Sequence, residues 1–169
     1  MSVALRAAEP HDLDFLVGLA NDEGVEPFLG GRQPRDEASL EAEIRRTADE
    51  PDRFGRLVIE ADGDRAGSVT WELVNERSSI VRLERLALAP TARGRGIALA
   101  ASRLLVRHLL VERGYHRLEL EIYAFNERAL ALADRVGYIR EGVKRQAYLR
   151  HGRWNDAVLL SMLRDDLGE

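Results

Sequence analysis

The fold is decided by residues 83–108, which read LERLALAPTARGRGIALAASRLLVRH. The apolar run Leu86–Ala89 predicts the end of a strand, because Pro90 stops it and a small turn follows. Two glycines and two arginines in Arg93–Ala98 then lead into a long segment with a helical spacing of apolar residues. Backbone N–H groups at a helix start are unpaired and lie at the positive end of its dipole. The stretch therefore predicts a turn that binds phosphate or pyrophosphate.

From Leu57 up to this stretch, apolar and polar residues alternate with a period of two, which is typical of strands. Turn residues at 62–64 and 75–79 divide it into three strands that follow one another in antiparallel order. The helix after the glycine turn is expected to end at Gly114, a residue type favoured at helix C-termini. The expected strands lie at 57–61, 66–74 and 80–89, and the expected helix lies at 96–113.

The remaining segments extend this pattern in both directions. A strand, a helix and another strand form a crossover unit, so strands 80–89 and 118–123 are expected to be parallel. The other expected elements are a strand at 3–7, a helix at 13–20 closed by Gly24, a loop at 28–34, helices at 36–49 and 126–136, and strands at 140–150 and 154–163. The sequence predicts one α/β domain over 1–169, with a mixed, mostly antiparallel twisted sheet of six to seven strands and helices on both faces.

The composition excludes several kinds of chemistry. The chain has 169 residues and no cysteine, so disulfides, thiolate nucleophiles and sulfur-ligated metals are excluded. The four histidines have no metal-ligand spacing, and we expect no metal site. The net charge of -4 argues against a nucleic-acid partner, which would need a basic surface. No apolar run could span a bilayer and no secretory signal is visible at the N-terminus, so we expect a cytoplasmic protein with no membrane partner.

Four short motifs resemble the GCN5-related N-acetyltransferase (GNAT) superfamily. They are Leu86-Ala-Leu-Ala-Pro90, Arg93-x-x-Gly96-x-Ala98, Asn126-x-x-Ala129 and Val136-Gly-Tyr138. The C-terminal part is similar to the branch that includes the ribosomal-protein N-terminal acetyltransferases, through Glu141-Gly142, Arg145, Tyr148, Gly152, Trp154 and Asp156. The resemblance covers residues 57–164. It implies acetyl transfer from acetyl-CoA to a primary amine, either a small amine or a protein N-terminus, and a central parallel strand pair that splays apart.

Acetyl-CoA carries a pyrophosphate, two pantetheine amides and a thioester, and the resemblance implies a place for each. The pyrophosphate suits the N–H groups of Arg93–Ala98, and the pantetheine amides suit an exposed strand edge at Leu86–Leu88. That edge could also polarise the thioester carbonyl. The residues expected to bind acetyl-CoA are Leu86, Ala87, Leu88, Arg93, Gly94, Arg95, Gly96, Ile97, Ala98 and Asn126.

Other interpretations of these residues stay open. The turn could be an ordinary glycine-rich connection, with Arg93 and Arg95 solvated. It could also belong to a dinucleotide fingerprint, although Leu99 stands where the third glycine or alanine of that motif belongs. Asn126 could act only as a helix N-cap, because asparagine is favoured there in any protein.

Direct transfer needs a group that takes a proton from the acceptor, because a free alkyl ammonium has a pKa near 10. Glu84, two residues before Leu86 in the central strand, is the first candidate for this base, and Glu72 and Tyr148 are weaker ones. Glu84 could instead form a cross-strand ion pair, since Glu72, Arg82 and Glu84 share a face on neighbouring strands. Tyr148 could be a half-buried aromatic residue of the sheet.

The sequence departs from the family at the acid that would protonate the leaving thiolate. Many members place a tyrosine four residues before the glycine that matches Gly137, and this chain has Ala133 there. The ribosomal branch commonly has a serine where this chain has Ala129. Tyr148 or water could supply the proton, and the sequence leaves both open.

The acceptor is left open as well. The acidic segment 36–52 would suit a cationic acceptor such as a polyamine, an aminoglycoside or a basic protein N-terminus, although such a segment is usually a solvated face. An acyl-CoA-binding sensor without turnover is the alternative function, because the usual tyrosine and serine are missing. A homodimer is one candidate for the oligomeric state.

Overall fold

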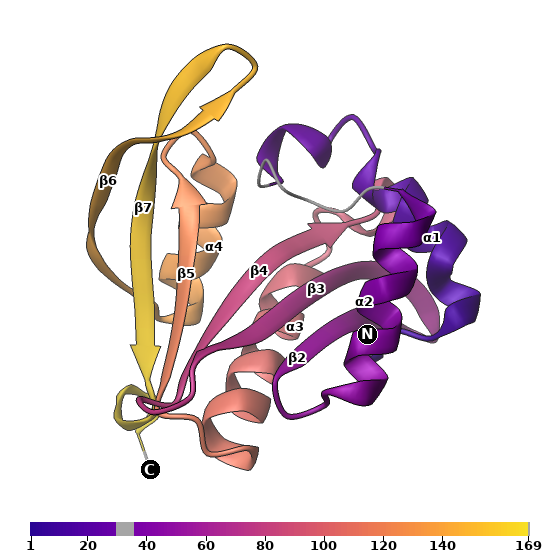
Figure 1. The fold of residues 1–169 in the computed structure, drawn as a ribbon, viewed down its shortest axis with the longest axis horizontal. Coiled ribbons are helices and arrows are strands. Elements are labelled where there is room, and N and C mark those ends of the chain that lie inside the picture. The colour runs from indigo at the N-terminus through magenta and orange to yellow at the C-terminus, as the bar shows by residue number, and fades with distance from the viewer. Residues whose placement is uncertain (30–35, 169) are drawn as a thin grey trace.

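The computed structural model describes residues 1–29 and 36–168, and it contains one seven-stranded sheet with helices on both faces (Figure 1). The strand order is β1-β2-β3-β4-β5-β7-β6. The strands are β1 (Val3–Ala7), β2 (Phe54–Ala61), β3 (Asp64–Asn75), β4 (Ile80–Leu88), β5 (Arg117–Tyr123), β6 (Ile139–Arg150) and β7 (Arg153–Leu163). All neighbours pair antiparallel except β4 and β5, which are parallel. The predicted mixed, mostly antiparallel sheet is confirmed.

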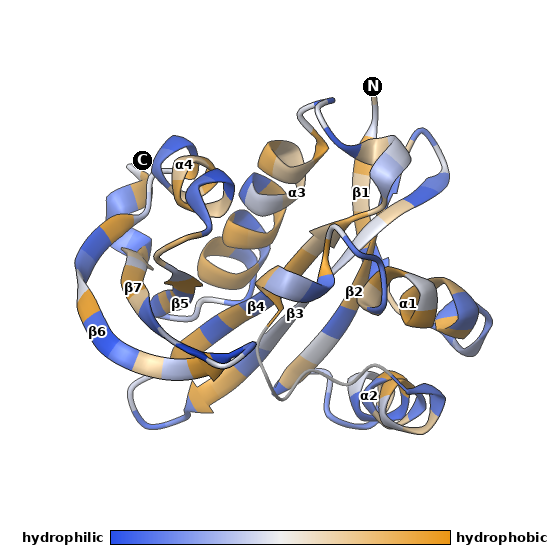
Figure 2. Cartoon of the chain, turned by 90° about the horizontal axis from the view of Figure 1, so that it is seen from above, coloured by the Kyte–Doolittle hydropathy of each residue, from blue (hydrophilic) through white to orange (hydrophobic). Residues whose placement is uncertain are grey.

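The helices form a layer on each side of this sheet. They are α1 (Leu13–Ala20), α2 (Glu37–Asp49), α3 (Ile97–Val106) and α4 (Glu127–Val136). Figures 1 and 2 show α1 and α2 together on one face and α3 and α4 on the other. Short helical turns lie at Pro10–Asp12, Glu26–Phe28, Pro90–Ala92 and Arg164–Leu167.

The apolar core is divided between the two faces in the same way. The larger part lies under α3 and α4 and contains Val81, Ile97, Leu105, Leu109, Leu118 and Leu160, each at most 1% exposed. The smaller part joins α1 and α2 to β2 through Leu16, Leu40, Ile44 and Val58. Each such side chain contributes about 1.5–3 kcal/mol when it is fully buried, so the sheet is held on both faces.

One expected helix end and one expected closing residue are wrong. The first helix spans the expected residues 13–20, but its C-cap is Asn21 and not Gly24. The helix after the glycine turn keeps α geometry only to Val106 and continues as a π-helical segment at Arg107–Glu112. Leu109 and Leu110 within this segment are both fully buried. The wider π turn allows these two consecutive side chains to face the sheet. Of the loop expected at 28–34, residues 30–34 lie outside the described part of the chain.

The strands β4 and β5 diverge to form a V (Figure 1). They pair only between Ile80–Arg82 and Arg117–Glu119. Beyond Arg82, the register of β4 against β3 shifts between the pairs Thr70–Glu84 and Ser68–Ala87, which is a β-bulge. Arg85 in this bulge has a φ of 59°, in the left-handed region that favours glycine. The predicted splay of the parallel pair is confirmed, and the bulge accounts for it.

A side-chain contact holds this unusual backbone in place. Arg85 Nη1 donates to Glu43 of α2 at 2.6 Å, so the bulge is tied to the helix layer on that face. Glu43 also accepts from Arg56 of β2 at 2.8 Å, and both arginines are largely buried. Such charge-assisted hydrogen bonds are stronger than neutral ones and offset the backbone strain. In the described part of the chain, no helix is both long and apolar enough to cross a membrane.

Candidate active site

The glycine turn ends on the N-terminus of α3 and is open to solvent. Gly94 and Gly96 have φ values of 75° and 77°, a conformation that glycine adopts without strain. No atom lies within 4 Å of a Cβ built at either glycine. The first hydrogen bond of α3 runs from the Ala100 N–H to the Gly96 carbonyl at 3.1 Å, so the amides of Ile97 and Ala98 precede the helical ladder. The turn therefore fits a pyrophosphate that is bound through the backbone.

The two arginines of the turn have other partners. Arg93 donates to Asp22 at 2.6 Å and to the carbonyl of Leu88 at 3.2 Å. Arg95 lies 3.6 Å from Asp62 and is half exposed. The guanidinium of Arg93 is thus held against the segment after α1. Of the two arginines, Arg95 has the more exposed side chain, and the roles of both in cofactor binding stay predictions.

The Leu86–Leu88 segment has one paired edge and one open edge. Ala87 and Leu88 pair with Ser68 and Gly67 of β3. The approach is close, because a Cβ at Gly67 would lie 2.2 Å from the Ala87 carbonyl oxygen. On the other side, β4 has no strand partner after Arg82 among residues 1–29 and 36–168. This open edge leads directly to the glycine turn and fits an extended arm with two amide groups.

Asn126 acts as the N-cap of α4, since its Oδ1 accepts from the Ala129 N–H at 3.2 Å. Asn126 therefore does cap the helix, and whether this is its only role is not decided by the cap. The cap uses only the oxygen of the side-chain amide, and its NH2 group remains a donor beside the exit of β5. The expected contact between Asn126 and the cofactor stays a prediction.

Glu84 lies in β4 just past the divergence from β5. Its carboxylate is half-exposed and lies 3.3 Å from Arg85 Nη2. The ion pair that Glu84 forms is with Arg85, its neighbour in β4, and Arg82 donates across strands to Glu119 at 2.8 Å. Glu72 accepts from Arg46 of α2 at 2.7 Å, so it supports the helix layer. Of the two glutamates, Glu84 is the one beside the open edge.

Tyr148 reaches back from β6 to the exit of β5. Its phenol donates to Glu121, and its ring meets Tyr123 edge-on at 5.8 Å between centroids. The hydrogen bond to Glu121, aided by burial, raises the pKa of Tyr148 to about 12. Partial burial opposes ionisation of Glu121, but the hydrogen bonds from Lys144 and Tyr148 outweigh it and lower the pKa of that carboxyl. Tyr148 is therefore a hydrogen-bond donor at neutral pH.

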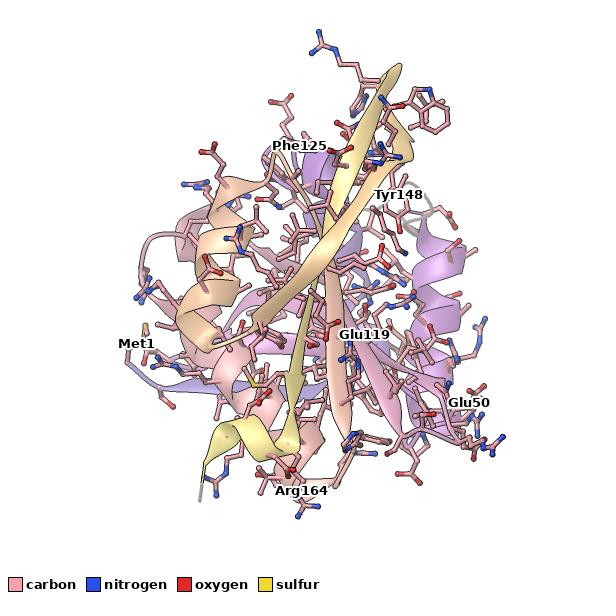
Figure 3. All side chains as sticks on the ribbon, turned by 90° about the vertical axis from the view of Figure 1, so that its left-hand side faces the viewer. Met1, Glu50, Glu119, Phe125, Tyr148 and Arg164 are labelled. Atoms are coloured by element: carbon pink, nitrogen blue, oxygen red, sulfur yellow. The ribbon has the colours of Figure 1, made fainter. Side chains whose placement is uncertain are left out.

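A cleft of about 200 Å³ opens on this face of the sheet, between β4, β5, β7 and β6. Figure 3 shows Tyr148 near the open end of the sheet and Glu119 closer to the end marked by Arg164. Glu84 and Tyr148 are outside the cleft lining but touch or face residues within it. The lining residues are Arg82, Arg117, Glu119, Leu120, Glu121, Glu141, Lys144, Leu159 and Leu160.

Sequence reasoning missed Glu121 and Lys144. The alternation of Leu118, Leu120 and Ile122 with glutamates placed Glu119 and Glu121 on the face opposite α3, and this is what the structure contains. No local signal indicated that Lys144 of β6 would reach Glu121, since the contact depends on the register of β6 against β7.

The residue that replaces the usual tyrosine lies inside the core. Ala133 is 4% exposed and packs in the layer beneath α4. Tyr138 is buried in the same layer, and burial raises the pKa of its phenol. In the part of the chain that the structure describes, no group of side chains could hold a metal ion. The chain therefore offers Glu84, Tyr148 and water for proton transfer at the cleft.

Comparison with known proteins identifies the family to which this chain belongs. A family model for the acetyltransferase (GNAT) domain matches residues 2–139. Spermidine N(1)-acetyltransferase of Escherichia coli K12 is 28% identical over 167 residues, which cover 93% of this chain and 83% of that protein. The uncharacterised prophage-derived N-acetyltransferase YokL of Bacillus subtilis is 23% identical over 166 residues, with 98% and 92% of the two chains covered.

Among solved structures, spermidine N-acetyltransferase of Vibrio cholerae in complex with CoA and spermine has a similar fold. The TM-score is 0.86 at 21% identity, and the match covers 97% of this chain and 96% of that one. The family match includes the open edge of β4, the glycine turn and Asn126. The chain therefore belongs to the GNAT acetyltransferase domain family, and its reaction is acetyl transfer from acetyl-CoA to an amine.

Proposed function

We propose that this enzyme acetylates a small amine with several positive charges, of the polyamine class. The observation that carries the proposal is the cleft beside the β4–β5 opening, in which Glu119, Glu121 and Glu141 are brought together. Arg82 and Arg117 hold Glu119 and Glu141, so the carboxylate open to an incoming ammonium is Glu121, whose cationic partner is the half-exposed Lys144. The net charge of -4 adds to the attraction for a cation. The Escherichia coli relative is named for spermidine, and the Vibrio cholerae structure holds spermine beside CoA.

Acetyl-CoA supplies the acetyl group as an activated thioester, and this chain offers a place for each of its parts. We assign the pyrophosphate to the amides of the Arg93–Ala98 turn, and the pantetheine amides to the open edge at Leu86–Leu88. The NH2 group of Asn126 lies across the opening and can support the same arm. Residues 1–169 act as one domain in this proposal, because β6 and β7 complete the sheet beyond the family match at 2–139.

Glu84 is the group we assign to proton removal. It lies in β4 two residues before the open edge, and its side chain is 40% exposed. The ammonium of the acceptor loses a proton to Glu84, directly or through one water, before or as the new C–N bond forms. The tetrahedral adduct loses a second N–H proton to solvent, its C–S bond breaks to leave the amide, and the released thiolate takes up a proton.

We assign that last proton to water. The phenol of Tyr148 is already donated to Glu121, and its pKa of about 12 makes it a weak acid. Ala133 has no side chain that could serve, and a thiolate near neutral pH is protonated readily by solvent. The assignment replaces the alternative in which Tyr148 acts as the acid.

A protein N-terminus is the competing acceptor, because the motifs from Glu141 to Asp156 resemble the ribosomal-protein branch. A peptide would have to enter the opening as an extended chain, whereas a polyamine needs only carboxylates at suitable spacing. The pair of Glu121 with a half-exposed lysine favours a small ammonium acceptor. Both hypotheses use the same acetyl-CoA site. An assay distinguishes them only when it varies the acceptor.

The test is to incubate the protein with acetyl-CoA and single acceptors, and to follow free thiol and product mass. The panel contains spermidine, spermine, propylamine, an aminoglycoside, and peptides with basic and neutral N-termini. We expect the polyamines to give the highest kcat/KM. Release of free thiol only when a peptide is the acceptor would overturn the polyamine assignment. Binding of acetyl-CoA without turnover on any amine would overturn the assignment as an enzyme.

A further inference from the structure

Two of the three carboxylates in the cleft are held by guanidinium groups. Arg117 Nη1 donates to Glu141 at 2.8 Å, and Arg82 donates to Glu119 at 2.8 Å. Arg117 also approaches Glu119 at 3.3 Å, which joins the two pairs. The planar guanidinium fork matches a carboxylate and stays in place. Glu119 and Glu141 therefore belong to a fixed ionic network that cross-links β4, β5 and β6.

Glu121 differs from both, because its cationic partner is an ammonium. Lys144 Nζ donates to Glu121 Oε1 at 2.6 Å, and the phenol of Tyr148 donates to the other oxygen. Lys144 is the single lysine of the chain, whose other 24 basic residues are arginine. An ammonium is a compact charge on a flexible stem and is exchanged more easily than a guanidinium fork. Glu121 thus already binds an ammonium, which is the same chemical group that a polyamine carries.

Lys144 is placed so that it can leave. Its side chain is 44% exposed, whereas that of Glu121 is 16% exposed. The β6 residues 139–149 are exposed, and the register of β6 against β7 shifts between Lys144 and Tyr148. The half-exposed Lys144 side chain is therefore free to turn toward solvent on the outer side of β6. Glu121 would then keep its hydrogen bond from Tyr148 and present its other oxygen to the cleft.

Glu121 of β5 and Glu84 of β4 both interact electrostatically with Arg82, which lies in β4 two residues before Glu84. Burial opposes the charge of Arg82, but the hydrogen bond and charge of Glu119, with smaller contributions from Glu121 and Glu84, raise its pKa. An acceptor that presents one amine to Glu84 can therefore direct a second ammonium to Glu121. A monoamine has no second ammonium that could bind at Glu121.

We propose that Glu121, together with the phenol of Tyr148, binds the distal ammonium of the acceptor, and that Lys144 occupies this position until the acceptor displaces it. Lys144 is then a specificity-determining residue that competes with its own substrate. Displacing Lys144 breaks its ion pair with Glu121, and the second ammonium of a diamine replaces that ion pair. The enzyme therefore prefers acceptors with two positive charges. This inference rests on the proposed function, since it assumes that the cleft receives a polyamine.

The kinetic test compares Lys144→Met with Lys144→Arg. The Met variant keeps the length and apolar character of the stem and removes the competing charge, so the KM for spermidine is expected to fall roughly three- to tenfold. The KM values for propylamine and for acetyl-CoA are expected to stay unchanged. The Arg variant keeps a cation on Glu121 and should show a KM for spermidine equal to or above that of the wild type. A KM for spermidine that is unchanged or raised in the Met variant overturns the proposal.

Glu121→Gln supplies the opposite change. It should raise the KM for spermidine about tenfold with little change in the kcat reached at saturation. In the double variant Glu121→Gln/Lys144→Met, the benefit of removing Lys144 should disappear, because there is no longer a charge to compete for. A benefit that persists in the double variant would contradict competition at Glu121.

A second readout does not depend on turnover. Because the chain has one lysine, protein labelled with 13C and 15N in lysine gives a single side-chain spin system. Spermidine should shift the Cε and Nζ signals of Lys144 in a saturable manner, while propylamine and matched NaCl should not. Turnover of spermidine with an unmoved Lys144 signal overturns this inference alone. Failure of every polyamine as a substrate overturns the proposed function, and a saturable shift would then still support ammonium exchange at Glu121.

Discussion

Arg93 donates to Asp22 at 2.6 Å, although the two residues are 71 positions apart in the chain. The same guanidinium donates to the carbonyl of Leu88, the last residue of β4. It also fills the space beside Gly24, where a Cβ would lie 2.6 Å from Nη1. One side chain therefore fixes the segment after α1 to the end of the open β4 edge. This arrangement sets the direction in which the chain enters the glycine turn.

Replacing Arg93 with Met should therefore weaken acetyl-CoA binding without touching the chemistry. The variant loses a charge-assisted hydrogen bond and a bond to the Leu88 carbonyl, so the turn is less well positioned. We expect the KM for acetyl-CoA to rise roughly three- to tenfold and kcat to change little. Initial rates at varied acetyl-CoA, together with calorimetric titration of CoA, measure this.

Asp22→Asn is the matched partner for this variant. Because both substitutions remove the same ion pair, the double variant should bind CoA no more weakly than Arg93→Met alone. Additive losses would mean that Asp22 and Arg93 act on the site separately.

Substitutions of Gly96 should act through backbone strain and not through a steric clash. Its φ of 77° costs an ordinary residue about 1–2 kcal/mol, and a β-branched residue suffers most. Nothing lies within 4 Å of a Cβ at this position, so a loss cannot come from a clash within the protein. We expect Gly96→Val to weaken CoA binding about tenfold and Gly96→Asn, which tolerates this region, to do less. Gly142→Ala, at an open position of β6 with ordinary φ, serves as the control for a general glycine effect.

The order of strands and helices could be predicted because each break carries a local signal. Pro90 ends β4, Gly137 ends α4 with a φ of 109°, and Asp36 caps α2 through the Ser39 N–H. The bulge at Arg85 carries no such signal. Its left-handed conformation is held by Glu43, 42 positions away, so only the assembled fold can stabilise it. The widening of α3 into a π segment likewise follows from the sheet that buries Leu109 and Leu110.

The two halves of the site differ in the same way. The acetyl-CoA half is contiguous in sequence, since the Leu86–Leu88 edge runs into the glycine turn, and a strand followed by a helix start has a recognisable chemistry. The acceptor half joins β4, β5 and β6. Glu121 could be placed on the correct face from its alternation, but its partners Lys144 and Tyr148 depend on strand pairing more than 20 positions away.

Glu84→Gln should lower turnover and change its pH dependence. The amide keeps the shape of the side chain but takes up no proton, so kcat at neutral pH is expected to fall about 10²-fold or more while acetyl-CoA binding is retained. The acidic limb of the pH–rate profile should shift or disappear. The control is Glu72→Gln on the neighbouring strand, whose carboxylate contacts Arg46 outside the opening. An unchanged profile in Glu84→Gln would remove Glu84 as the base.

Asp12 should govern stability in acid. Its side chain is fully buried and accepts from Arg6 at 2.7 and 2.9 Å and from the Glu9 N–H at 2.9 Å. The hydrogen bonds from Arg6, opposed by burial, lower the pKa of Asp12 from 3.8 to about 2. A carboxyl whose pKa is lower in the folded state stabilises the protein above its ordinary pKa and loses this contribution as the pH falls. We expect about 2 kcal/mol to be lost between pH 4 and pH 2.

Urea unfolding at several pH values between 2 and 7 measures this loss. Asp12→Asn should be less stable at pH 7 and should have a flatter dependence below pH 4. Asp14→Asn, at an exposed position of the next turn, should follow the wild-type curve. If the Asp12 variant loses as much stability in acid as the wild type, another carboxyl is responsible.

Tyr148→Phe separates hydrogen bonding from acid catalysis at the cleft. With a pKa of about 12, set mainly by the hydrogen bond to Glu121, the phenol stays protonated throughout the range in which the enzyme can be assayed. Its removal should therefore leave the alkaline limb of the pH–rate profile in place. Glu121 loses one donor, so its hold on a distal ammonium changes, and we expect the KM for spermidine to rise about threefold. Tyr115→Phe, whose hydroxyl donates to the Asp52 carbonyl on another part of the surface, controls for the loss of a hydroxyl as such. An alkaline limb that vanishes only in Tyr148→Phe would make Tyr148 the acid that protonates the thiolate, and water would no longer be needed in that role.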